Sequence, residues 1–105
     1  MSHLYILDGH NPVEEKNVIK WGYWIEKADR HVAVTEFPKC RVSTVFLGIN
    51  HNLEFSEPIL FETMVFWTDN TKDIEEISRR CSTWNQAEKI HMEIVEQVKE
   101  MMRIQ

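Results

Sequence analysis

The chain has 105 residues, of which 12 are basic and 17 acidic, and 43% of its residues are apolar. This content predicts one globular domain over residues 1–105, and four Trp, five Phe and two Tyr exclude a disordered chain. No apolar run approaches the roughly 20 residues of a membrane span, and the start has no secretory-signal pattern, so we expect a cytoplasmic protein. The net charge of −5 argues against direct binding to nucleic-acid phosphates.

The N-terminal part predicts one strand and one helix. Residues 3–7 are β-like and lead into a turn. We expect a helix with Asn11 as its N-cap and Pro12 as its first residue, and a start nearer Glu15 is the alternative. Its apolar stripe has helical spacing and consists of Val18, Trp21, Ile25 and Ala28. Gly22 lies within this helix, where a missing side chain lets another backbone approach closely.

Three β-rich segments follow in the middle of the chain, at residues 31–37, 41–49 and 59–68. The last two are joined by a loop that is too short for a crossover helix, so they should pair antiparallel. Residues 75–82 are interpreted as a returning edge strand, with a short helix as the alternative. Both faces of the third segment are mostly apolar. Helices can cover one face, and the other must meet the remaining strands, a ligand or a partner chain, from which we expect a homodimer.

The C-terminal part predicts a long helix. Thr83 is placed to cap it, with Gln86 three residues later as the capping-box partner. Its apolar stripe consists of Trp84, Ala87, His91, Ile94, Val95, Val98, Met101 and Met102. The order is thus β-α-β-β-β-(β)-α, which predicts an α+β domain in which two helices lie on a mainly antiparallel sheet of four to five strands.

Few residues indicate chemistry. His91 lies within the apolar stripe of the last helix, and we interpret it as a neutral core residue, with a ligand or proton-transfer role as the alternative. Cys81 lies near the positive end of that helix, which favours a thiolate, but no His or Asp stands beside it, so a structural thiol is the interpretation. We expect Cys40 and Cys81 to be free thiols. The sequence has no metal-ligand spacing and no phosphate loop, and it predicts no metal, cofactor or catalytic residue.

The acidic feature of the chain is the stretch from residue 54 to residue 76, in which Lys72 is the only basic residue. Such a stretch can meet a basic protein surface, and a solvated face that only maintains solubility is the alternative. Trp is a favoured interface anchor, which makes Trp24 and Trp67 the better candidates for contact. The predicted binding residues are Glu54, Glu57, Trp67, Asp69, Asp73 and Trp24.

A second possible site combines His51 with Glu62. Glu62 is the only charged side chain in the segment 59–68 and shares a face with apolar residues, where a carboxylate has a raised pKa and can act as an acid or a base. His51 of the preceding loop is its possible partner if the loop folds back. An ion pair between Glu62 and Arg41, or another basic residue, is the structural alternative.

Three stretches of the chain resemble a family of uncharacterised small proteins encoded by tailed phages and prophages. They are Val42-Ser43-Thr44-Val45-Phe46-Leu47-Gly48-Ile49-Asn50-His51, Pro58-Ile59-Leu60-Phe61-Glu62-Thr63-Met64-Val65-Phe66, and Cys81-Ser82-Thr83-Trp84 with Ala87 and His91. Leu7-Asp8-Gly9, Pro12-Val13 and Trp21-Gly22-Tyr23-Trp24 also fit. The resemblance covers nearly the whole chain and implies a phage setting and a compact α+β domain. The more acidic loop at residues 52–57 and the bulkier residues 67–69 depart from the family, which points to a specialised binding surface.

The expected function is that of a small phage-encoded accessory protein that binds a host protein in the host cytoplasm. An anti-CRISPR or other anti-defence inhibitor of a host nuclease or defence complex, acting through the acidic surface, is the leading form of this hypothesis, and it rests on analogy. The alternative is a binder or hydrolase of a small nucleotide-like ligand, with His51, Glu62 and Trp24 lining its pocket. A flat acidic surface would favour the first function, and a cleft containing both His51 and Glu62 would favour the second.

Overall fold

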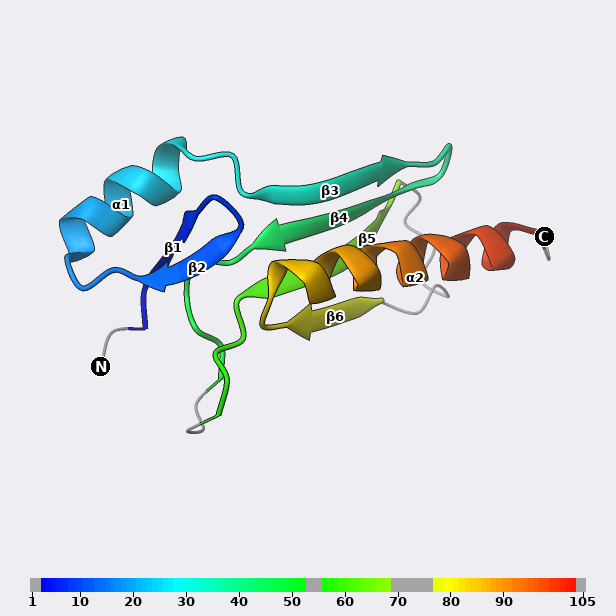
Figure 1. The fold of residues 1–105 in the computed structure, drawn as a ribbon. Helices are drawn as coiled ribbons and strands as arrows, with labels where there is room; N and C mark the ends of the chain where they lie inside the picture. The colour runs from blue at the N-terminus through cyan, green and yellow to red at the C-terminus, as the bar shows by residue number, and fades with distance from the viewer. Residues whose placement is uncertain (1–2, 53–55, 69–76, 104–105) are drawn as a thin grey trace.

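The computed structural model describes residues 3–52, 56–68 and 77–103. In chain order the elements are β1 (Tyr5–Asp8), β2 (Asn11–Glu14), α1 (Val18–Lys27), β3 (His31–Glu36), β4 (Cys40–Phe46), β5 (Phe61–Trp67), β6 (Ser78–Cys81) and α2 (Trp84–Arg103) (Figure 1). The described strands form a small β1–β2 sheet and a four-stranded sheet in the order β3-β4-β5-β6. The predicted α+β class is confirmed, and β2 is a strand that the sequence pattern did not predict.

The expected helix start at Asn11 is wrong, because residues 11–14 form β2 instead. This strand pairs antiparallel with β1, so that Leu7 lies opposite Pro12. Gly9 has a φ of 62°, a left-handed conformation that suits the tight turn between the two strands. Pro12 lacks a backbone N–H, which is tolerated in a strand with only one neighbouring strand.

Asn17 sets the start of α1, which is later than either predicted start. Its side-chain Oδ1 accepts hydrogen bonds from the backbone N–H groups of Ile19 (3.0 Å) and Lys20 (3.2 Å). These N–H groups belong to the first turn of the helix, where no backbone carbonyl is available to them. The cap therefore satisfies donors that a start at Pro12 would have had to satisfy elsewhere.

The large sheet is antiparallel throughout. Strands β4 and β5 pair from Cys40 opposite Trp67 to Phe46 opposite Phe61, which confirms the predicted pairing of the two central segments. Strand β6 pairs with β5, so the edge-strand interpretation is confirmed for Ser78–Cys81. Residues 75 and 76 of the predicted segment lie outside the described residues.

Helix α2 begins with the predicted capping box. Thr83 Oγ1 accepts from the backbone N–H of Gln86 at 3.1 Å, and the Gln86 side-chain oxygen accepts from the backbone N–H of Thr83 at 3.1 Å. The residues of the helix that are buried against the sheet lie on one face: Ala87, His91, Ile94, Val95 and Val98. The final helix and most of its predicted stripe are thus confirmed.

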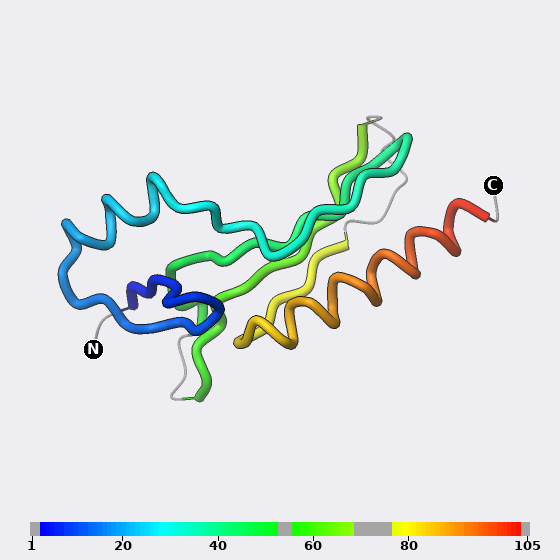
Figure 2. Tube along the Cα trace, turned by 45° about the horizontal axis from the view of Figure 1, so that its top comes forward, coloured from blue at the N-terminus to red at the C-terminus, as the bar shows by residue number. Residues whose placement is uncertain are grey.

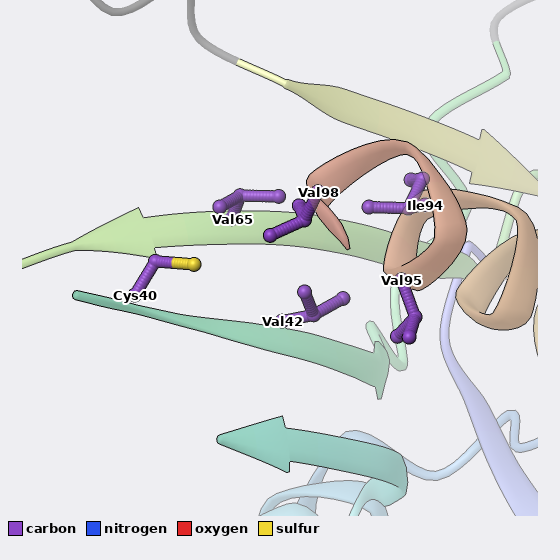
Figure 3. Close-up of a cluster of buried hydrophobic side chains, with 6 residues drawn as sticks. All are labelled: Cys40, Val42, Val65, Ile94, Val95 and Val98. Carbon is purple, nitrogen blue, oxygen red and sulfur yellow. The ribbon is translucent and has the colours of Figure 1, made fainter. Parts of the chain in front are cut away.

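The core consists of two apolar clusters on the α2 side of the sheet. The first contains Cys40, Val42, Val65, Ile94, Val95 and Val98 (Figure 3). The second contains Phe46, Leu60, Phe61 and Ala87. Between the two clusters lie three buried polar residues, Thr44 on β4, Thr63 on β5 and His91 on α2. A buried polar layer therefore separates the two apolar clusters.

His91 is a core residue, as predicted. Its Nδ1 lies 2.8 Å from Thr44 Oγ1, and its Nε2 lies 2.8 Å from Thr35 Oγ1. Thr44 Oγ1 lies in turn 2.7 Å from Thr63 Oγ1. Both ring nitrogens therefore have hydrogen-bond partners, and burial lowers the pKa of His91 below its ordinary 6.5.

The two helices are arranged differently from the expectation that both lie on the sheet. Helix α2 runs along one face of the four-stranded sheet, whereas α1 lies with the β1–β2 hairpin beyond one end of it (Figures 1 and 2). The molecule is accordingly elongated, with extents of 49 × 29 × 25 Å. On the opposite sheet face, Val34 and Phe66 are each 45% exposed.

Candidate functional site

The predicted acidic surface is not one continuous stretch of the described structure. Glu57 is exposed in the loop before β5, where its carbonyl oxygen accepts a hydrogen bond from Asn52 Nδ2 at 2.8 Å. Glu54, Asp69 and Asp73 lie outside the described residues. The stretch is interrupted by β5, whose 7 residues span about 20 Å. Glu57 therefore lies before one end of β5, and the described chain leaves the other end of this strand at Thr68.

The Trp67 side chain packs mainly within the fold. Its side chain is half-buried and packs against the core cluster around Val42 and Val65. Its indole Nε1 is buried and has no hydrogen-bond partner among the described residues. The ring is thus less available as a contact surface than the sequence suggested.

His51 and Glu62 interact with different residues. The Glu62 carboxylate is bound by Arg80, with Oε2 2.7 Å from Nε, and these residues are register partners on β5 and β6. An ion pair was the structural alternative for Glu62, although Arg80 takes the place suggested for Arg41. His51 is exposed, and its backbone N–H donates to the Ile59 carbonyl.

The two cysteines are free and lie at opposite ends of the sheet. In the strand register, Cys40 lies opposite Trp67 and Cys81 lies opposite Phe61. Trp67 and Phe61 are the two end residues of β5. Burial raises the pKa of both thiols. For Cys81 this effect outweighs the opposing influence of the Thr83 backbone and Arg79, so the environment does not favour a thiolate.

Trp24 lies in a different part of the molecule, on α1. Its ring packs edge-on against Phe46, with centroids 5.7 Å apart and an interplanar angle of 88°. The same side chain also lines a shallow surface hollow of about 510 Å³ beside Tyr23 and Lys27. Trp24 thus connects the core to the surface of α1.

Helix α1 is attached along one side. The Trp21 indole N–H is shared between the carbonyl oxygens of Tyr5 (3.2 Å) and Gly48 (3.0 Å). Gly48 has a φ of 77°, and a Cβ at that position would collide with Ile25 Cδ1. Only glycine permits this approach without strain. The contact holds α1 against the hairpin and the loop after β4.

The other side of α1 exposes apolar side chains. Val18, Ile19 and Tyr23 are 63%, 68% and 64% exposed, whereas the inner side chains of α1 are half-buried. Val18 shares the helical spacing of the predicted inner stripe, but it is the first residue of the helix and is exposed, so the stripe is packed only from Trp21 onward. Gly22 lies among these residues, and nothing lies within 4 Å of the position a Cβ would take, so the backbone approach predicted there is not made by the described part of this chain.

We define the α1 outer face as Ile19, Gly22 and Tyr23, with Val18 at its N-terminal edge and Lys20 and Lys27 along its border. Glu26 is exposed on the same side, three residues after Tyr23 and seven after Ile19. The described residues place no carboxylate within ion-pair distance of either lysine. Lys27 Nζ instead lies 5.8 Å from the centre of the Tyr23 ring. This face thus combines apolar groups with two lysines and one glutamate, in a chain whose net charge is −5.

The sequence contained a signal for this face that periodicity alone did not separate. Val18 and Ile19 are adjacent, and Tyr23 follows Ile19 by four residues, so the helix carries apolar side chains on two sides. Only one side can face the protein interior.

The described residues show neither a metal site nor a membrane-spanning helix. Within residues 3–52, 56–68 and 77–103, no three His, Cys, Asp or Glu side chains group closely enough to hold a metal ion. The same residues contain no helix that is long and apolar enough to cross a membrane. No protein-family model, curated protein or solved structure significantly matches this chain.

Proposed function

We propose that this protein acts without catalysis, by binding another protein through the α1 outer face. The observation that carries the proposal is the joint exposure of Val18, Ile19 and Tyr23 on a helix whose other apolar side chains are half-buried. Contiguous apolar residues on a surface are characteristic of interaction sites, whereas single exposed apolar residues are ordinary. The face is therefore a better candidate than the isolated Met92 on α2.

The energetics favour such a contact. Complete burial of a Val or Ile side chain stabilises a complex by about 1.5–3 kcal/mol, and Tyr combines a large apolar ring with a polar end. Gly22 leaves the helix backbone accessible between these side chains. A partner element can then approach α1 closely, which increases the number of contacts each exposed side chain makes.

The biological setting follows from the resemblance and remains part of the proposal. A phage-encoded accessory protein in the host cytoplasm, including an inhibitor of a host defence complex, would need a binding surface and no catalytic centre. The acidic stretch from residue 54 to residue 76 is retained as a second possible contact region. The nucleotide-ligand alternative has less support, because Arg80 already holds the Glu62 carboxylate.

Site-specific photocrosslinking in host cells tests the proposal. Benzoylphenylalanine is placed at Ile19 and, in matched controls, at Met92 and Val34, which are 56% and 45% exposed. We expect a discrete crosslinked protein from Ile19 alone, and excess unlabelled chain should compete for it. Chain carrying Ile19→Ser and Tyr23→Ser should fail to compete. No adduct at Ile19, or the same adduct from all three positions, would contradict the proposal.

A further inference from the structure

The hollow beside the α1 outer face has a defined lining. Its residues are Lys20, Tyr23, Trp24, Lys27 and Ala28. Lys20 and Lys27 are seven positions apart, which corresponds to two helical turns and a rise of about 10 Å. The two aromatic residues lie between them in the sequence, so positive charge flanks an apolar floor.

The floor of this hollow is held in place from below. Trp24 packs on Phe46, a fully buried residue of β4, with its ring perpendicular to the Phe46 ring. Tyr23 is held less tightly, since it is mostly exposed and its neighbour is Lys27. An incoming side chain therefore meets one fixed ring and one adjustable ring.

The charges at the hollow select the sign of its occupant. Lys20 and Lys27 are exposed and are not neutralised by a described carboxylate. The acidic residue of α1, Glu26, is absent from the lining, because a step of one residue turns the helix by about 100° away from Lys27. A carboxylate placed between the two lysines would gain attraction from both.

We propose that the hollow receives an acidic, apolar segment of a protein partner, with a carboxylate between Lys20 and Lys27 and an aromatic or aliphatic side chain against Tyr23 and Trp24. This inference rests on the proposed function and adds the chemistry of the partner. A protein segment fits better than a nucleic acid, because two lysines neutralise few phosphates and the chain is acidic overall. It also fits better than a membrane, because α1 has only 10 residues and includes Glu26.

Peptide titration with the intact protein tests this chemistry directly. The probe is a short synthetic peptide in which glutamate and phenylalanine alternate, and its controls replace all glutamates by lysine or all phenylalanines by glycine. We expect the probe to shift the NMR signals of the Trp24 indole and of the Tyr23 ring, while both control peptides leave them unchanged. The Trp21 indole N–H, which is bound by two carbonyls, should shift less.

Charge reversal supplies the matched variants. Lys20→Glu with Lys27→Glu should weaken probe binding about tenfold or more, since two attractions become repulsions. Lys89→Glu, on an exposed position of α2, should leave probe binding unchanged. Equal weakening by all variants would show a general charge effect and would overturn the inference.

Two further outcomes would also overturn it. Equal shifts at Trp24 from vesicles of phosphatidylglycerol or from a single-stranded oligonucleotide would assign the hollow to a membrane or a nucleic acid. If the protein crosslinked at Ile19 still binds the double lysine variant with unchanged affinity, the inference fails while the proposed function stands. If crosslinking at Ile19 fails but the probe binds at the hollow, the proposed function fails at the outer face instead.

Discussion

The two helices of this protein use their apolar residues in opposite ways. Helix α2 has 20 residues and buries five of them against the sheet. Helix α1 has 10 residues and half-buries Trp21, Trp24 and Ile25 on its inner side, while its outer side exposes further apolar side chains. Because a folded chain gains stability only from the surface that it covers, the apolar residues on the outer side of α1 do not serve the fold.

This difference shows that an apolar pattern with helical spacing does not by itself reveal which side of a helix faces the core. In α2 the stripe, the capping box and the buried positions agree, as expected of a helix that completes a core. In α1 the inner side is held by Trp21 while the outer side exposes Ile19 and Tyr23. The exposed apolar residues of α1 are the basis of the proposed binding surface.

The largest expected effect compares the same substitution in the two helices. Ile94 is fully buried, whereas Ile19 is 68% exposed. Ile94→Ala should lower the free energy of unfolding by about 2–5 kcal/mol, because it leaves a cavity in the core. Ile19→Ala should change it by no more than about 0.5 kcal/mol. Urea denaturation measures both, and similar losses from both variants would mean that α1 supports the fold as α2 does.

The attachment of α1 predicts a smaller effect. Trp21→Phe removes an N–H that two carbonyls share, and we expect a loss of about 1–2 kcal/mol in unfolding free energy. Trp24→Phe is the control, since it removes the same ring area without a described hydrogen bond. Amide hydrogen exchange should show α1 opening in the Trp21 variant before the sheet does. Equal effects of the two substitutions would refute the role assigned to the indole N–H.

His91 predicts a pH dependence that belongs to the α2 side of the molecule. Burial lowers its pKa in the folded state, while the unfolded chain retains a value of about 6.5. As the pH falls through 6.5 and then through the folded pKa, the unfolded state takes up the proton first, so the free energy of unfolding falls. His91→Gln, which keeps a donor and an acceptor, should lose this component. Denaturation curves between pH 8 and pH 5 that are parallel for both proteins would contradict the assignment.

Much of the fold was predictable because its signals are local. The Thr83–Gln86 capping box and the position of His91 in the stripe needed no knowledge of distant residues. The start of α1 could not be predicted from local signals. Both Asn11 and Asn17 are acceptable N-caps, and the pairing of β2 with β1 decides between them. The location of the proposed binding surface also depended on distant packing, because only the tertiary structure determines which apolar side of α1 faces inward.

Charge reversal in the acidic stretch should also have little effect on stability. Glu57→Lys with Asp73→Lys should change the free energy of unfolding by no more than about 0.5 kcal/mol. Their effect on association with the crosslinked partner separates two hypotheses. An acidic partner at α1 should associate as fast or faster with the less acidic variant, whereas slower association would assign the contact to residues 54–76. Stopped-flow measurements at low and high salt give both rates.

Gly22→Ala tests the central claim most directly, because the account predicts opposite signs for two quantities. Gly22 lies inside α1 with open space at its Cβ position, so alanine should raise the free energy of unfolding by about 0.5–1 kcal/mol. The added methyl group should at the same time weaken binding of the partner crosslinked at Ile19, because it stands in the path of a closely approaching element. Both quantities are measured on the same variant by denaturation and titration. A more stable variant that binds less tightly supports a surface made for a partner; a variant with undiminished binding, or with lower stability, contradicts it.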